Sequence, residues 1–247
     1  MKRFYKDARV VEADDSGGPR GGGSGGGPGG GLRIELDGRP VKTPGRALLL
    51  LPNRPLAQAV AAEWAAQSET IKPQSMPCMS LACTAIDLIA PRRAEAVAEI
   101  AAYGETDLVC YRADHPPELV VRQTATWQPL LDWAALTFDA PLVVTTGVLH
   151  KEQPAAAVAA LGRAVEAQDD LSLAALATAV KAAGSLIIGL ALQGGRLDAK
   201  AAFAAAELDA LFQTEIWGED PEAARQRAGV RAELEAAERF LALLRSQ

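Results

Sequence analysis

Alanine dominates the second half of the chain and limits what that half can fold into. There are 28 alanines between Lys151 and Gln247, and alanine has the highest helix propensity of the amino acids. We therefore expect helices over residues 154–168, 171–193, 198–216 and 221–245. Gly184 lies inside the second of these, where it favours a kink or close packing. Three aspartates are expected to act as N-caps of these helices, with Pro221 at a first helical position: Asp170, Asp198 and Asp220.

The first third of the chain has the periodicity of strands. Leu32–Leu36 alternates apolar with charged residues, which is typical of a half-buried strand. Asp37-Gly38 follows it and predicts a tight hairpin turn, because glycine tolerates the positive φ that such a turn needs. A small antiparallel meander would then be completed by Ala8–Glu12, Arg39–Lys42 and Ala47–Leu51.

Between these two parts the pattern becomes helical. Asn53 is placed to cap a helix that runs to about Gln67. A short helix is expected around Leu81–Leu88, another from Pro91 to a left-handed cap at Gly104, and a long one over Pro117–Phe138. Leu142–Thr146 predicts a short β-like break.

The sequence thus predicts an α+β protein with two domains. We expect a β-rich N-terminal domain over residues 1–90 and a multi-helical C-terminal domain over residues 91–247. Eleven of the 22 glycines fall in Gly17–Gly31. A phosphate-binding loop needs a strand before it and a helix after it, but this run lies between two predicted strands, so we expect a flexible loop.

Composition excludes several functional classes. Apolar residues make up 49% of the chain and the net charge is −6, which argues against a nucleic-acid or anionic-membrane binder. The longest apolar run, Leu186–Leu192, is far shorter than the roughly 20 residues that cross a bilayer. Three cysteines without a signal peptide favour a reducing compartment. Met1–Asp15 lacks the character of a transit segment, so we expect a bacterial cytoplasmic protein.

No arrangement of residues in the sequence predicts catalysis. His115 and His150 lie in predicted loops without a partner in a recognisable frame. Cys78, Cys83 and Cys110 have no zinc-knuckle spacing, so we expect no metal and no cofactor, and interpret Cys83 and Cys110 as small core residues. The alternative is a small-molecule enzyme with a site in an inter-domain cleft, using carboxylates from this set: Glu63, Asp87, Glu105 and Asp107. Asp87 and Asp107 are equally well explained by helix termini and buried hydrogen bonds.

Acidic residues gather in one segment. Residues 198–222 contain seven acids and one base. For Glu207 and Asp209 a solvated helix face is the simpler interpretation. Glu215 differs, because it shares a helical stripe with Leu208, Leu211 and Phe212.

A carboxylate on an apolar stripe should either meet a cationic partner or end the stripe at an exposed rim. The nearest candidate partners in sequence are Arg225, Arg227 and Arg231. Trp217-Gly218 forms the corner that follows, and an aromatic residue beside a charge at an exposed corner is also typical of a protein contact site.

Several strings of residues in one order resemble a known family over nearly the full length. They are Asp37–Pro44, Ala62–Trp64, Met76-Pro77, Thr84–Asp87, Glu105–Arg112, Thr145–Gly147, Gly184–Leu186 and Phe212–Gly218. Together they resemble the assembly chaperones of the F1 sector of ATP synthase that bind the F1 α subunit in mitochondria and α-proteobacteria. The long glycine run departs from the short connection usual in that family.

The resemblance implies a non-enzymatic chaperone that shields the unassembled F1 α subunit without ATP, metal or cofactor. The family has a β-containing N-terminal and a helical C-terminal domain, and an acid in the helical region matters for its function. Glu215 is the best match to that acid, beside Trp217 and Gly218, with Glu207 and Glu219 as neighbouring candidates for partner binding. Eukaryotic relatives would lie in the mitochondrial matrix.

The last predicted helix leaves a third interpretation open. Leu234, Ala237, Leu241 and Leu244 form an apolar stripe along it. Such a stripe could join two copies of the chain, but packing in the chain's own core explains it more simply, so we expect a monomer.

Overall fold

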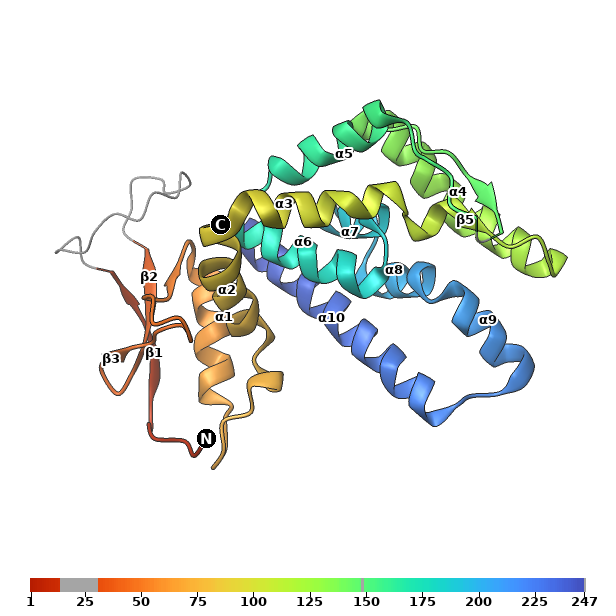
Figure 1. Ribbon diagram of the computed structural model, residues 1–247. Coiled ribbons are helices and arrows are strands. Elements are labelled where there is room, and N and C mark those ends of the chain that lie inside the picture. Colours follow the sequence, from red (N-terminus) through yellow and green to blue (C-terminus); the bar gives the residue numbers. More distant parts are fainter. Residues whose placement is uncertain (14–30, 148, 247) are drawn as a thin grey trace. The chain divides into compact units, whose positions relative to one another are not determined.

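A computed structural model describes residues 1–13, 31–147 and 149–246 (Figure 1). The predicted loop Gly17–Gly31 lies outside this range except for Gly31. The described chain forms two compact units. Unit 1 comprises Met1–Arg93, Asp169–Ala175 and Arg239–Gln247, and unit 2 comprises Ala94–Gln168 and Leu176–Glu238. The predicted assignment of residues 1–90 and 91–247 to two domains stays a prediction.

The sheet of unit 1 is antiparallel, as the sequence predicts. β1 (Ala8–Glu12) pairs with β2 (Leu32–Leu36) in a register that places Val10 opposite Ile34. β2 also pairs with β3 (Arg39–Pro40) and β4 (Leu50–Leu51), both shorter than predicted. Asp37 and Gly38 have positive φ, which confirms the tight turn.

One face of the sheet is covered by α1 (Arg54–Ala65). Asn53 caps this helix, since its side chain accepts a hydrogen bond from the Leu56 amide. Ile34, Leu51, Leu56 and Val60 are fully or almost fully buried, so the alternating pattern of β2 and the helical pattern of α1 meet in one core.

The helices after α1 follow each other with little interruption. α2 (Pro77–Thr84) continues into a π-helical turn, η2 (Ala85–Ile89), a 3₁₀ turn, η3 (Ala90–Arg92), and α3 (Arg93–Ala101). Pro91 is therefore accommodated in a 3₁₀ turn rather than at the start of a separate helix. The predicted left-handed cap at Gly104 is wrong, because Gly104 lies buried in the turn η4 (Ala102–Glu105), where an added Cβ would lie 3.2 Å from Leu161.

The described residues of unit 2 form one short strand pair, and their other regular elements are helices. α4 (Pro117–Phe138) has the predicted limits. β5 (Tyr111–Arg112) pairs in parallel with β6 (Thr145–Thr146), which is the predicted break. Two elements follow the residues that the alanine content predicts, namely α5 (Ala155–Glu166) and α10 (Pro221–Arg245).

Two of the predicted helices are each divided in two. The first becomes α6 (Asp170–Ala183) and α7 (Leu186–Gln193), separated at Gly184, which has φ +63°. The second becomes α8 (Ala199–Ala206) and α9 (Leu208–Trp217), with Glu207 between them.

The predicted caps can be compared with the observed helix ends. Asp198 and Asp220 cap as predicted, but Asp169, and not Asp170, caps α6 by accepting a bond from the Ser172 amide. Asp170 instead forms an ion pair with Arg93. None of the described helices is both long enough and apolar enough to span a bilayer.

Candidate functional site

The carboxylates of the enzyme alternative are engaged in backbone hydrogen bonds. In unit 1, Glu63 is 6% exposed and accepts bonds of 2.8 Å from the amides of Cys78 and Met79 at the start of α2. Asp87 accepts a 2.6 Å bond from the Thr43 hydroxyl and a 2.7 Å bond from the Gly45 amide. These two acids therefore hold a helix terminus and a turn, and burial raises the pKa of Glu63.

Asp107 has the corresponding role in unit 2. It is fully buried and accepts hydrogen bonds from the Ser185 hydroxyl at 2.6 Å and from the Ile187 amide at 2.9 Å, which begin α7. Burial raises the pKa of Asp107 to about 6. Glu105 is exposed in η4. The hypothesis that Asp87 and Asp107 serve helix termini and buried bonds is confirmed for Asp107, while Asp87 holds a turn.

The cysteines and histidines form no reactive site in the described chain. Cys78 and Cys110 are buried, and burial raises their thiol pKa values to about 12; the pKa of Cys83 is about 11. His115 is exposed beside Asp114, and His150 lies 3.4 Å from the Tyr111 hydroxyl. Within residues 1–13, 31–147 and 149–246, no three His, Cys, Asp or Glu side chains are grouped as a metal site requires.

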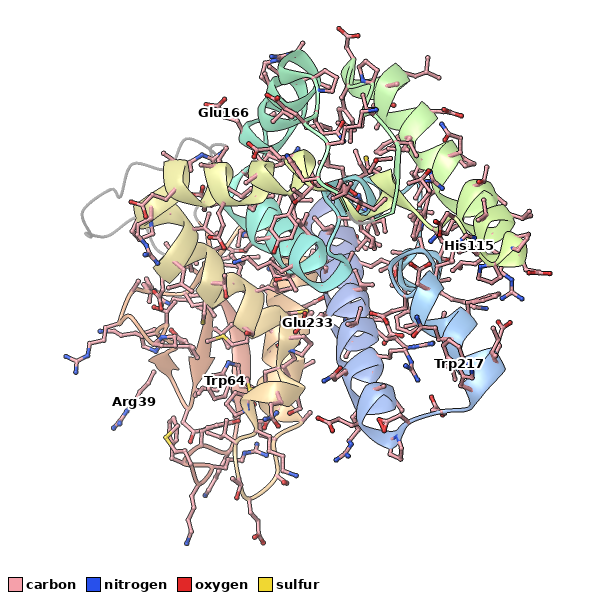
Figure 2. All side chains as sticks on the ribbon, turned by 45° about the vertical axis from the view of Figure 1, so that its right-hand side comes forward. Arg39, Trp64, His115, Glu166, Trp217 and Glu233 are labelled. Carbon is pink, nitrogen blue, oxygen red and sulfur yellow. The ribbon has the colours of Figure 1, made fainter. Side chains whose placement is uncertain are left out.

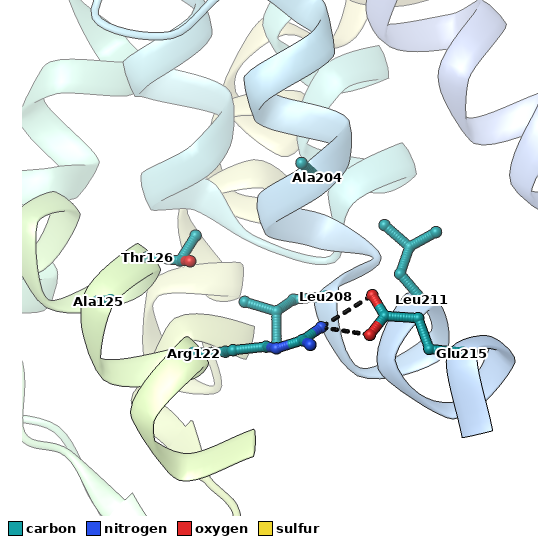
Figure 3. A pocket seen from close by; sticks show the side chains of 7 residues that line it. All are labelled: Arg122, Ala125, Thr126, Ala204, Leu208, Leu211 and Glu215. Atoms are coloured by element: carbon teal, nitrogen blue, oxygen red, sulfur yellow. Dashed lines mark hydrogen bonds and ion pairs between the residues drawn. The ribbon is translucent and has the colours of Figure 1, made fainter. Parts of the chain in front are cut away.

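A groove of about 300 Å³ lies between α4, α8 and α9 in unit 2 (Figure 3). Its walls are mostly apolar, and one acid and one base stand among them. The residues that line it are Arg122, Ala125, Thr126, Ala204, Leu208, Leu211 and Glu215. Three of these, Leu208, Leu211 and Glu215, belong to the stripe that the sequence predicts on α9.

An exposed ion pair joins the two helices beside this groove. Nη1 of Arg122 lies 2.8 Å from both carboxylate oxygens of Glu215, and the two side chains are 48% and 56% exposed (Figure 3). The Arg122 guanidinium also lies 5.1 Å from the ring centroid of Phe212. Glu215 therefore ends the apolar stripe at an exposed rim and has a cationic partner there.

The partner of Glu215 differs from the sequence prediction. Arg225, Arg227 and Arg231 follow in the chain, but the ion pair is made by Arg122, which precedes Glu215 by 93 residues on α4. Sequence proximity carried no signal for this pairing, because α4 reaches α9 only through the tertiary fold.

Two further hydrogen bonds tie α4 to the same segment. Trp127 Nε1 donates to the Ala205 carbonyl at 2.8 Å in the core, and Gln123 Nε2 donates to Asp209 Oδ1 at 2.8 Å nearer the surface. Trp127 and Gln123 are 1% exposed. The sequence pattern identified neither as a site residue, and Asp209, expected on a solvated face, is half-buried.

The end of α9 carries two exposed apolar side chains. Ile216 is 54% and Trp217 is 76% exposed, and Figure 2 shows Trp217 at the end of the helix. Gly218 ends α9 with φ +86°, a conformation that side chains rarely adopt. The predicted corner is therefore present, and its aromatic residue faces solvent.

Glu207 and Glu219 both lie near Arg227. The guanidinium of Arg227 donates a 2.9 Å bond to Glu219 Oε1. Partial burial raises the pKa of Glu207, and the nearby charge of Arg227 opposes that rise. The structure thus places the five predicted partner-binding residues on one continuous segment, residues 207–219, with Glu215 facing α4 and Glu219 facing α10.

Comparison with known proteins matches this fold to a group of chaperones. The family model described as ATP12 chaperone protein matches residues 2–135. The crystal structure of Atp12 from Paracoccus denitrificans is 39% identical and superposes with a TM-score of 0.88, over 99% of this chain and 98% of that one. An aspartate-to-lysine mutant of the same Paracoccus protein gives the same values.

Two other relatives agree. A putative chaperone from Agrobacterium tumefaciens is 38% identical with a TM-score of 0.89, over 99% of this chain and 86% of that one. The mitochondrial protein atp12 of Schizosaccharomyces pombe is 24% identical over 201 residues, which cover 75% of this chain and 68% of that protein.

These matches define the chain first as a chaperone with an α+β fold. More particularly, it belongs to the ATP12 chaperone family, as the resemblance of its sequence strings predicts.

Proposed function

We propose that this protein is a non-enzymatic assembly chaperone of ATP synthase that binds the unassembled F1 α subunit with the surface around α9. Membership of the ATP12 family supports an ATP synthase assembly chaperone. We assign the contact to Glu215, Trp217 and Gly218 together with the groove beside them, and place Glu207 and Glu219 at its border. The proposed place of work is the bacterial cytoplasm, with no cofactor.

The observation that carries this proposal is the exposed end of α9. Trp217 and Ile216 face solvent beside an apolar groove. Tryptophan is enriched among residues that dominate protein interfaces, above all where it can enter a partner's pocket. An α subunit without its neighbours exposes the apolar surface of an obligate interface. An apolar, partly charged surface of this kind can cover such a surface reversibly without nucleotide hydrolysis.

The ion pair beside the groove suits reversible binding. Exposed pairs of this type contribute at most about 1 kcal/mol, because water screens both charges. A partner can therefore replace Arg122 as the neighbour of the Glu215 carboxylate at small energetic cost. No observation favours the enzyme alternative, since Glu63, Asp87 and Asp107 are each bonded to backbone amides.

Replacing Glu215 by lysine tests the proposal. Glu215→Lys places an ammonium group beside the Arg122 guanidinium at the edge of the groove, so that two cations meet there and the proposed contact is lost. We expect binding of purified α subunit to weaken at least about tenfold, since like-charge contacts in an interface cost more than 1 kcal/mol. The measurements are titration calorimetry and light scattering of aggregating α subunit, both without nucleotide.

Two further variants make this test specific. Glu233→Lys makes the same charge change on an exposed face of α10 and should bind like the wild type. The double variant Arg122→Glu with Glu215→Arg restores an internal pair with reversed signs and should still bind weakly. A wild-type protein that neither binds the α subunit nor delays its aggregation contradicts the proposal, as does an unweakened, folded Glu215→Lys variant.

A further inference from the structure

A second hollow lies between α9 and α10. It holds about 230 Å³ and, like the groove, has an apolar floor with charged residues around it. The residues that line it are Phe203, Leu211, Glu219, Ala224, Arg227, Ala228 and Arg231. Leu211 lines both hollows, so α9 stands between them. None of the five residues assigned above from the sequence, except Glu219, lies in this second hollow.

Arg231 is the cation of this hollow that lacks an acidic partner within the described chain. Its guanidinium lies 4.2 Å from the ring centroid of Phe203, which is 4% exposed. The ion pairs formed by the described residues do not include Arg231, and its side chain is exposed. The ring below holds the guanidinium in place, while its hydrogen-bond donors remain available to a ligand.

Arg227 differs from Arg231, because acidic neighbours compensate its positive charge. It is 9% exposed and pairs with Glu219 at 2.9 Å, and Glu207 lies within its electrostatic influence. Its positive charge is therefore compensated inside the chain. An anionic group that entered the hollow would be attracted mainly by Arg231.

The hollow is accessible from the side of α10, because most side chains in the first half of this helix are exposed or half-buried. From Pro221 to Glu233, a stretch that the structure describes throughout, Arg227 is the one buried residue. Ala224 and Ala228 provide a smooth surface, and a Cβ added at the neighbouring Gly229 would meet nothing within 4 Å. Another polypeptide can therefore approach this stretch of helix closely.

We propose that this hollow binds an acidic, apolar segment of the client protein. A carboxylate of that segment pairs with Arg231, and an adjacent apolar side chain covers Leu211, Ala224 and Ala228. Carboxylates fit the two parallel donors of a guanidinium, which a lysine ammonium does not offer. A polyanion such as nucleic acid is disfavoured, because Glu219 lines the hollow and the charge of Glu207 lies close to Arg227. This inference rests on the proposed function, because it requires one client to contact the groove on one side of α9 and the hollow on the other.

Reversing the charge of Arg231 tests this contact in the complex with the α subunit. We expect Arg231→Glu to weaken binding about tenfold, because repulsion replaces a charge-assisted bond. Arg231→Lys keeps the charge but loses the planar donors, and should weaken binding about threefold. Arg225→Glu is the matched control, since Arg225 is exposed on the same helix and lines neither hollow. Equal weakening by Arg231→Glu and Arg225→Glu would overturn the inference.

A second measurement separates this inference from the proposed function. The probe is a short synthetic peptide with one glutamate between leucines, and its counterpart has lysine in place of that glutamate. We expect the glutamate peptide alone to shift the methyl NMR signals of Ala224 and Ala228, with the shift lost in Arg231→Glu. Shifts caused by both peptides, or by neither, would contradict the proposal that the hollow binds an acidic segment. If the wild type bound the glutamate peptide but did not bind the α subunit, the result would contradict the proposed function and not the ligand of the hollow.

Discussion

At the scale of single residues, the buried acids stabilise helix starts rather than catalyse a reaction. Asp107 and Glu63 each place carboxylate oxygens at the amides of a helix N-terminus, α7 for the former and α2 for the latter. A helix N-terminus carries a partial positive charge and amides without partners, so both features favour a carboxylate there. The burial that makes these contacts strong also disfavours ionisation, which makes stability depend on pH.

Asp107 gives a pH prediction with a definite sign. Its pKa is about 6 in the folded chain against an ordinary value of 3.8, so the folded state retains the proton over a range where the unfolded state has lost it. The stabilisation by this group is complete below pH 3.8 and is lost as the pH rises through 6. The loss amounts to about 3 kcal/mol between about pH 3.5 and about pH 7.5.

Comparison of unfolding free energies with the Asp107→Asn variant measures this loss. The variant is less stable than the wild type, because its single amide oxygen cannot accept both the bond from the Ser185 hydroxyl and the bond from the Ile187 amide, which reach different oxygens of Asp107. The difference between the two proteins should shrink as the pH rises from about 4 to about 7. Asn53→Ala, which removes an N-cap that carries no titrating group, serves as the control and should show no such trend. A difference that is constant over this range would contradict the role of Asp107.

At the scale of elements, the ends of helices were set by contacts that the sequence pattern does not display. The predicted helix over residues 171–193 breaks at Gly184 because Asp107, far back in the chain, bonds Ser185 and the Ile187 amide. Gly189 has a different role, since an added Cβ there would lie 2.5 Å from Val180 Cγ2 and 3.3 Å from its backbone nitrogen. The close packing that the sequence favoured near Gly184 is found at Gly189.

Two glycine-to-alanine variants should therefore change stability in opposite directions. Gly189→Ala forces α6 and α7 apart and should lower the free energy of unfolding by about 1–3 kcal/mol. Gly229→Ala lies on the exposed side of α10 with open space around it and should raise stability by about 0.5–1 kcal/mol, because alanine favours the helix. Chemical denaturation at one pH measures both. A Gly189→Ala protein as stable as the wild type would contradict the close approach of these helices.

At the scale of the whole molecule, local signals predicted the fold better than the site. The hairpin at Asp37-Gly38, the cap at Asn53 and the limits of α4 follow from nearest neighbours along the chain, and all three are observed. Glu215 was identified because it interrupts an apolar stripe, which is again a local pattern. Its partner Arg122 was missed, because that contact depends on the packing of α4 against α9. Recognition of the family added what local patterns could not supply.

The state of association is the last property that the structure lets us predict. Leu234, Ala237 and Leu241, three of the four residues in the stripe that could have joined two copies, are at most 3% exposed. A residue covered by its own chain cannot also contribute apolar area to a dimer, and stable dimers bury about 1,200 Å² or more in total. We expect light scattering to give a mass of 25.9 kDa over an approximately hundredfold range of concentration. With the α subunit, we expect a one-to-one complex, because each chain has one α9. A mass that rises with concentration, or Leu244→Glu converting a dimer to a monomer, would show instead that the end of α10 joins two copies.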